Sequence, residues 1–158
     1  MTFDERLELA RTIRARVKDL EVPAWFEDQA NAAAAEATEI TRELAGAFGW
    51  DDVDLDGMNA EEGAARTLAA LLDCMACPHL RRGGPQPALA RLAVRRVDCL
   101  RCAHTVCRPP SDEVDRCDWC GARGVQRFQP AAIQLGMTLV IGDRCRDCST
   151  ATSSRSAA

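Results

Sequence analysis

Residues 99–121 read CLRCAHTVCRPPSDEVDRCDWCG and contain two Cys-x-x-Cys pairs, Cys99/Cys102 and Cys117/Cys120. Two residues between cysteines allow one tight turn to present both sulfurs to a single tetrahedral ion. Gly121, directly after the second pair, suits the turn that leaves such a knuckle. The segment therefore predicts a fold that is organised around bound metal.

The same spacing occurs twice more, before and after this segment. A closed structural zinc site needs four ligands, so two pairs complete one site and four pairs complete two. Cysteines buried in an ordinary core would not repeat one spacing, and a thioredoxin-like motif needs a single pair within a βαβ pattern. We therefore predict two structural Zn²⁺ ions per chain. The predicted ligands are Cys74, Cys77, Cys99, Cys102, Cys117, Cys120, Cys145 and Cys148.

The pattern Cys99-x2-Cys102-x14-Cys117-x2-Cys120-Gly121 resembles that of the zinc ribbons, in which two knuckles from two β-hairpins hold one zinc ion. The resemblance implies that these four cysteines share one ion. The first and last pairs of the chain, 74/77 and 145/148, would then form a second site. We favour this nested pairing.

Two other pairings use the same ligands. In a sequential arrangement the first two pairs in the chain share one ion and the last two pairs share the other. In a crossed arrangement, as in RING-like domains, the first pair joins the third and the second joins the fourth. His79, His104 or Cys107 could replace a cysteine. An iron–sulfur cluster, which also takes four thiolates, is the alternative metal group and would make the protein a redox sensor.

The N-terminal part has the periodicity of amphipathic helices. Thr2 and Glu5 form a capping-box pattern, Pro23 suits the first turn of a second helix, and Asn59 can cap a third. The apolar stripes predict helices over about 3–20, 23–47 and 59–74. Their short connections favour an antiparallel bundle.

The run RRGGPQP at 81–87 is the clearest break in the chain. Beyond it, Met137–Ile141 predicts a strand, and Leu92–Val97 predicts either a strand or a short helix. We therefore expect an α+β fold with an acidic helical region over 1–76 and a small β-rich, zinc-ribbon-like module over 77–148. Cys74 and Cys77 would reach that module from the end of the third helix. The small polar residues of 149–158 predict a disordered tail.

Charge divides the chain at the same place. Residues 1–76 carry 7 basic and 17 acidic side chains and residues 77–158 carry 13 and 7, so balances of −10 and +6 make up the net −4. Eight zinc-bound thiolates and two Zn²⁺ ions would lower the +6 to about +2. The C-terminal half is then mildly basic at most, and the acidic helical region favours a basic protein partner.

Two features of the sequence bear on location. The N-terminus lacks the apolar stretch of a signal peptide, and no apolar run reaches the length of a membrane-spanning helix. We therefore expect a cytoplasmic protein that does not bind membranes. Thiols stay reduced in that compartment, which favours metal binding over disulfides.

The predicted sites are closed, whereas a catalytic zinc keeps an open position. Neither histidine stands in the H-x-E pattern of zinc deaminases, and no phosphate-binding glycine loop occurs. We therefore predict a non-enzymatic adaptor or regulator that acts through protein contacts, with self-association through the helical region as a further expectation. The alternative is a nucleic-acid-binding protein, in which Arg91, Arg95 and Arg96 contact phosphates and Trp119 stacks on a base.

Overall fold

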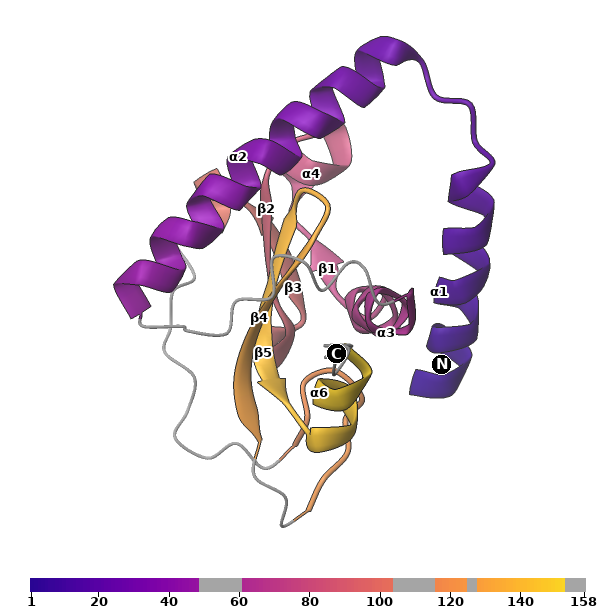
Figure 1. Cartoon of the computed structure of the whole chain (residues 1–158), viewed down its shortest axis with the longest axis vertical. Helices are drawn as coiled ribbons and strands as arrows, with labels where there is room; N and C mark the ends of the chain where they lie inside the picture. Colours follow the sequence, from indigo (N-terminus) through magenta and orange to yellow (C-terminus); the bar gives the residue numbers. More distant parts are fainter. Residues whose placement is uncertain (49–60, 104–115, 125–127, 153–158) are drawn as a thin grey trace, which may run out of the picture.

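A computed structural model of the chain describes residues 1–48, 61–103, 116–124 and 128–152 (Figure 1). The helices are α1 (Phe3–Lys18), α2 (Ala24–Phe48), α3 (Glu61–Leu71), α4 (Pro78–Arg82), the 3-10 turn η2 (Leu92–Val94), α5 (Leu100–Ala103) and α6 (Arg146–Thr152). The strands are β1 (Met75–Ala76), β2 (Ala88–Arg91), β3 (Arg96–Cys99), β4 (Gln129–Leu135) and β5 (Thr138–Arg144). The predicted α+β class is confirmed.

The five strands form one mixed sheet in the order β1-β3-β2-β5-β4. Strand β2 is antiparallel to β3 on one side and parallel to β5 on the other. Strands β3 and β5 therefore run in opposite directions, and their carboxyl ends lie at opposite ends of the sheet. The short strand β1 is parallel to β3, so both of these strands end at the same place.

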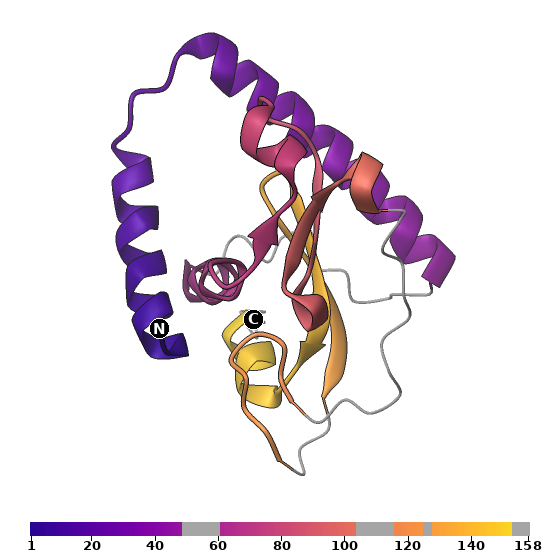
Figure 2. The same ribbon diagram turned by 180° about the vertical axis from the view of Figure 1, so that it is seen from behind.

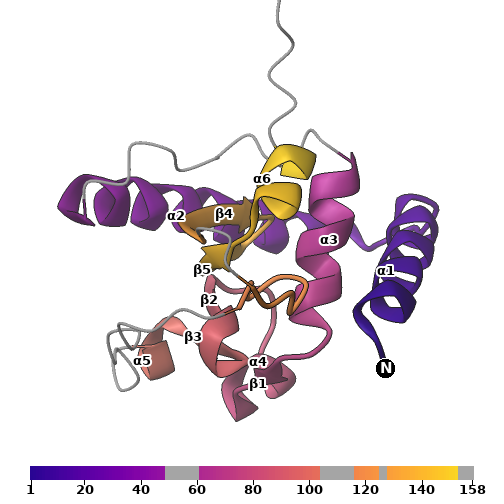
Figure 3. The same ribbon diagram turned by 90° about the horizontal axis from the view of Figure 1, so that it is seen from below.

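One face of the sheet forms the main core of the protein. Successive side chains of a strand point to opposite faces, so the paired residues Ile133 and Val140 share a face, and Ala90 lies beside Val140 on the same face. These side chains pack against Ala70 of α3 and the buried ring of Trp119. Helices α3 and α6 cover this side of the sheet (Figure 3).

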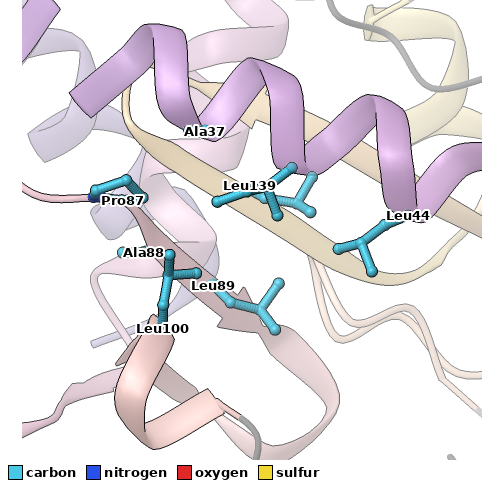
Figure 4. Close-up of a pocket in the computed structure, with 8 residues that line it drawn as sticks. Ala37, Leu44, Pro87, Ala88, Leu89, Leu100 and Leu139 are labelled. Carbon is cyan, nitrogen blue, oxygen red and sulfur yellow. The ribbon is translucent and has the colours of Figure 1, made fainter. Parts of the chain in front are cut away.

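Helix α2 covers the opposite face and crosses the sheet diagonally (Figure 1). Figure 4 shows Ala37 and Leu44 of α2 above Leu89 and Leu139 of the sheet, with Leu100 of α5 at the side of the small apolar pocket between them. The buried alanines of α2 allow this close approach because they have no side chain beyond the β-carbon. The fold therefore has three layers, with the sheet between α2 and the other large helices.

The first and third helices form an antiparallel pair. Arg6 of α1 donates a hydrogen bond to the carbonyl of Ala69 near the end of α3, whereas Lys18 pairs with Glu61 at its start. Leu7 and Ala10 of α1 are buried in the contact between the helices. The predicted bundle of three helices is thus reduced to a pair, because α2 packs on the sheet instead.

The ends of the predicted elements show two further differences. The third helix ends at Leu71, and Met75 already belongs to β1. Helix α6 continues to Thr152, into the segment that the sequence predicts to be a disordered tail. The capping box is confirmed, since the Thr2 hydroxyl accepts from the Glu5 amide and the Glu5 carboxylate accepts from the Thr2 amide. Among the described helices, none is long and apolar enough to cross a membrane.

Candidate metal centres

Two groups of metal-ligating side chains stand out in the described residues. Site I consists of Cys77, His79, Cys99 and Cys102, and site II consists of Cys117, Cys120, Cys145 and Cys148. Within each group, all four ligand atoms lie within 4.8 Å of one another. Seven of the eight predicted cysteines therefore fall into two four-ligand groups, each arranged to hold one metal ion.

Site I forms where β1 and β3 end side by side. The amide of Cys77 donates to the carbonyl of Val97 at 2.9 Å, which fixes the end of β1 against β3. The amide of Cys99 then donates to the sulfur of Cys77 at 3.4 Å. His79 comes from α4, and its Nδ1 lies 3.3 Å from the sulfur of Cys102 in α5. Site I is thus built from the ends of two strands and two very short helices.

Site II forms at the opposite end of the sheet. Its first knuckle closes through the amide of Gly121, which donates to the carbonyl of Cys117 at 2.8 Å, and Gly121 has the positive φ of 77° that the sequence predicts for such a turn. Strand β5 leads into Cys145, whose amide donates to the sulfur of Cys117 at 3.3 Å. The sulfurs of Cys120 and Cys145 lie 3.8 Å apart.

The two sites share one local design. In each, a strand leads into a Cys-x-x-Cys pair that opens a helix, and the amide of the pair's first cysteine donates to a sulfur from another segment. Figure 2 shows the result, with α4 and α5 toward the upper end of the sheet and residues 116–124 with α6 at the lower end. The opposite directions of β3 and β5 separate the sites.

The electrostatics of both groups favour a cation. In site II, hydrogen bonds from the thiols of Cys120 and Cys148 lower the pKa of Cys117, whereas contacts with Cys117 and then with Cys120 raise the pKa of Cys148. In site I, burial followed by contact with Cys99 raises the pKa of Cys102 to about 11. The thiol of Cys117 therefore ionises more readily than those of Cys120 and Cys148, whose pKa values are raised. A divalent cation at the centre removes the repulsion between the thiolates.

Backbone amides prepare one sulfur of site I for the charged state. Burial alone would raise the pKa of Cys77, but hydrogen bonds from the amides of Cys99, Leu80 and His79 lower it overall. Amide donors aimed at a buried sulfur stabilise a thiolate, which is the form that binds metal.

The spacing of two ligand sulfurs in site II fits a single tetrahedral ion. With Zn–S bonds of about 2.3 Å, two sulfurs at neighbouring corners of a tetrahedron are about 3.8 Å apart. The distance between the sulfurs of Cys120 and Cys145 is 3.8 Å. A multi-iron cluster must fit several irons and sulfides between its thiolates and would hold them farther apart.

The two groups follow the sequential pairing except that His79 stands in place of Cys74, so the favoured nested pairing is wrong. The two knuckles of the predicted zinc ribbon lie in different groups, with Cys99 in site I and Cys117 in site II. In a zinc ribbon both knuckles bind one ion. Here the sheet separates the two knuckles, because the carboxyl ends of β3 and β5 lie at opposite ends of the sheet.

Cys74, a predicted ligand, lies outside both groups. In site I, His79 occupies the ligand position that the sequence pattern assigns to Cys74. The sulfur of Cys74 contacts the carbonyl of Ala70 at 3.6 Å, one turn back along the chain, and its side chain packs against the main core. The useful signal was Pro78, which begins α4 directly after Cys77, so that His79 follows in the first turn of this short helix. His104 and Cys107 lie outside the described residues.

Trp119, the predicted base-stacking residue, is 1% exposed. Its ring belongs to the main core, and its indole nitrogen donates to the hydroxyl of Thr67 at 3.3 Å. The structure leaves no ring face accessible for a base.

The three candidate phosphate-binding arginines have partners within the fold. Arg91 and Arg96 both pair with the fully buried Asp98, at 3.5 Å and 2.8 Å. Arg95 donates to the carbonyl of Asp118 at 2.9 Å. Arg91 and Arg96 thus neutralise the buried carboxylate of Asp98, and Arg95 holds the backbone of the first knuckle of site II at Asp118. Nucleic-acid binding remains a prediction.

Asp98 is a residue whose importance the sequence did not reveal. It stands directly before Cys99 and holds Arg96 through two hydrogen bonds at the end of β3. The alternation Arg96-Val97-Asp98 places both side chains on one face of the strand, which is the signal that could have identified the pair.

Comparisons of the chain with protein-family models, with curated proteins and with solved structures give no match. The two cysteine-rich groups therefore carry the functional argument by themselves.

Proposed function

We propose that this protein is a non-enzymatic adaptor whose fold is stabilised by two structural zinc ions and which acts by binding another protein. The observation that carries the proposal is the presence of two separate four-ligand groups, each with all ligand atoms within 4.8 Å of one another. Four protein ligands complete a tetrahedral zinc ion and leave no position for a substrate or a reactive water.

Zinc is the metal that the donor sets favour. A Cys₄ group and a Cys₃His group are both typical of structural zinc. In site II, Cys117, Cys145 and Cys148 are part of the main core. A bound ion would therefore act as a cross-link in the middle of the protein. A ligand set buried in this way supports a structural role, because metal binding then contributes directly to folding.

An exposed apolar surface supports the proposed protein contact. Val17, Leu20, Val22 and Trp25 are 57%, 61%, 47% and 61% exposed, and they surround the connection between α1 and α2. This connection lies away from the sheet, at the top of Figure 1. The ring of Trp25 packs edge-on against that of Phe26, which adds a second aromatic side chain beside the exposed residues. We name these four exposed residues the connector patch.

Charge around the connector patch indicates the chemistry of its partner. The exposed charged side chains over 16–28 are the acidic Asp19, Glu21, Glu27 and Asp28 and the basic Arg16 and Lys18, so acidic groups predominate. Exposed apolar side chains flanked by charged groups are a common feature of interaction sites. The best-fitting partner is an amphipathic segment with apolar anchors and basic flanks, which agrees with the acidic charge of the N-terminal half.

Metal content tests the first half of the proposal. Protein purified without added metal is examined by native mass spectrometry and elemental analysis, and two zinc ions per chain are expected. A chain that folds with no metal, or that carries iron together with inorganic sulfide, would overturn the proposal.

The protein contact is tested with a helical Leu/Lys peptide as the probe. The zinc-loaded chain should bind the peptide, and the affinity should fall as salt increases because the acidic rim contributes. Trp25→Ala, in α2, should weaken binding. Leu9→Ala should not, because it changes an exposed residue in the middle of α1 that does not belong to the connector patch. Equal binding by all three proteins would show that the connector patch is not the contact surface.

A further inference from the structure

The two candidate zinc sites differ in their exposure to solvent. In site II, Cys117, Cys145 and Cys148 are between 0% and 3% exposed, and all three belong to the main core. In site I, His79 is exposed and Cys102 is half-buried, whereas Cys77 and Cys99 are buried. Cys120 of site II is also half-buried, but no ligand of site II is exposed, so His79 gives an incoming ligand a more open approach to site I than any ligand gives to site II.

The elements that hold the ligands are also smaller around site I than around site II. Site II is held by the seven-residue strand β5 and by α6, which packs against α3. Site I takes His79 from the five-residue helix α4 and Cys102 from the four-residue helix α5. No residue of α4 is buried. Movement of α4 away from site I therefore exposes little apolar surface, whereas opening site II disrupts the core.

The ligands differ in chemistry as well. His79 is the one nitrogen ligand among the eight described candidate ligands, and it binds zinc as a neutral imidazole. Its departure leaves three thiolates on the ion and separates no charge. A sulfur ligand leaving site II would instead withdraw a thiolate from a divalent ion within a buried environment, which is electrostatically costly.

From these three differences, and resting on the proposed zinc-binding function, we propose that site I is an exchange site. It passes Zn²⁺ to and from small thiol or carboxylate chelators, while site II keeps its ion as long as the chain is folded. Exchange would begin when a donor atom of the chelator forms a bond to zinc as the bond between zinc and the His79 nitrogen breaks. Further donor atoms of the chelator would then replace the three zinc–sulfur bonds one by one, and the released thiolates would take up protons from water or bind an incoming ion. The imidazole leaves neutral, and no electron is transferred.

The matched substitution for this proposal is His79→Cys, which makes site I a Cys₄ group like site II. His79→Ala removes the nitrogen ligand and leaves three cysteines. Arg81→Ala changes an exposed residue of the same short helix that belongs to neither site, so it serves as the control.

The experiment measures zinc transfer from the loaded full-length chain to the chromogenic chelator 4-(2-pyridylazo)resorcinol. Two phases of equal amplitude are expected, one ion each, with rates that differ by about tenfold or more, in line with the 10- to 100-fold effects of changes around metal ligands. His79→Cys should slow the fast phase, His79→Ala should accelerate it or remove it from the loaded protein, and Arg81→Ala should leave it unchanged. The slow phase should be the same in all variants.

A second measurement identifies the exchanging site without relying on variants. Co²⁺ added to the zinc-loaded chain should replace one ion and give the ligand-field absorption of a three-sulfur, one-nitrogen site. A single release phase, or a four-sulfur spectrum in the exchanged protein, would overturn the exchange proposal while leaving two bound zinc ions in place. Fewer than two ions in the unsubstituted protein before chelation would instead contradict the proposed function.

Discussion

The indole nitrogen of Trp119 lies 3.3 Å from the hydroxyl oxygen of Thr67 and donates a hydrogen bond to it. Both residues are fully buried, and they come from parts of the chain separated by 52 positions. The bond connects the first knuckle of site II to α3, which in turn packs against α1. The metal site and the N-terminal helix pair are therefore parts of one packed unit.

The first prediction concerns this contact. Trp119→Phe removes the donor and part of a buried ring, and we expect unfolding to become easier by about 2 kcal/mol. Thr67→Val removes the acceptor, which also bonds to the carbonyl of Gly63. The double variant should show a coupling free energy of about 1 kcal/mol in denaturant unfolding of the zinc-loaded protein. Strict additivity of the two single variants would show that the bond contributes nothing.

The second prediction separates Cys74 from the metal ligands. Cys74→Ser should keep two zinc ions, because its sulfur contacts the carbonyl of Ala70 and no ligand group. Cys77→Ser should lose the ion of site I, since its sulfur is buried among the other ligands and accepts from the amide of Cys99. Native mass spectrometry of the two purified variants makes the comparison. Loss of an ion from Cys74→Ser alone would restore the sequence-based assignment.

Much of the local structure was predictable because short-range rules determine it. The capping box at Thr2 and Glu5 formed as expected, and the strand after Met137 was found within a few residues. The cysteine spacing also identified seven of the eight residues of the two ligand groups. These features depend on neighbouring residues in the chain, which a sequence shows directly.

The arrangement of the sites was not predictable because it depends on strand directions. Nothing near Cys99 or Cys117 shows that β2 pairs antiparallel with β3 and parallel with β5, yet this separates the two knuckles. The burial of Trp119 has the same origin, since its partner Thr67 lies in a helix that contributes no metal ligand. The sequence alone predicts that a residue at the tip of a knuckle is exposed, because it does not show that α3 covers this knuckle.

The third prediction concerns pH and the start of α1. Hydrogen bonds from the Thr2 backbone and then its side chain hold the pKa of Glu5 below its ordinary value of 4.5. A carboxylate with a lowered pKa stabilises the folded state above its unfolded pKa, and this contribution is lost as the pH falls through the folded value. Glu5→Gln should therefore be less stable than the parent protein at neutral pH, and the difference should shrink below about pH 4.5.

The measurement is the difference in denaturation midpoint between the two proteins across a pH series. Metal release in acid affects both proteins alike, so the difference reports the Glu5 carboxylate. A difference that stays constant from neutral pH into acid would mean that the charged capping box does not stabilise α1.

The fourth prediction tests how α2 is held on the sheet. The buried side chain of Gln134 in β4 donates to the carbonyl of Ala34 at 3.1 Å and to the hydroxyl of Thr38 at 2.9 Å, both in α2. The other described residues of α2 at the pocket between the helix and the sheet are apolar, namely Ala37, Ile40 and Leu44, so the Gln134 amide is a main polar contact of α2 with the sheet. Gln134→Ala should destabilise the protein by about 1–3 kcal/mol, because the amide is lost from a buried site.

The loss should be local. Amide hydrogen exchange in α2 should accelerate in Gln134→Ala. The amides of β5 should stay protected, because β5 is paired on both sides within the sheet and is also held by the main core on the other face. Glu36→Ala, which changes an exposed residue of the same helix, should leave exchange in α2 unchanged. Equal acceleration in α2 and β5 would mean that α2 is not an independently docked layer and that the two faces of the sheet unfold together.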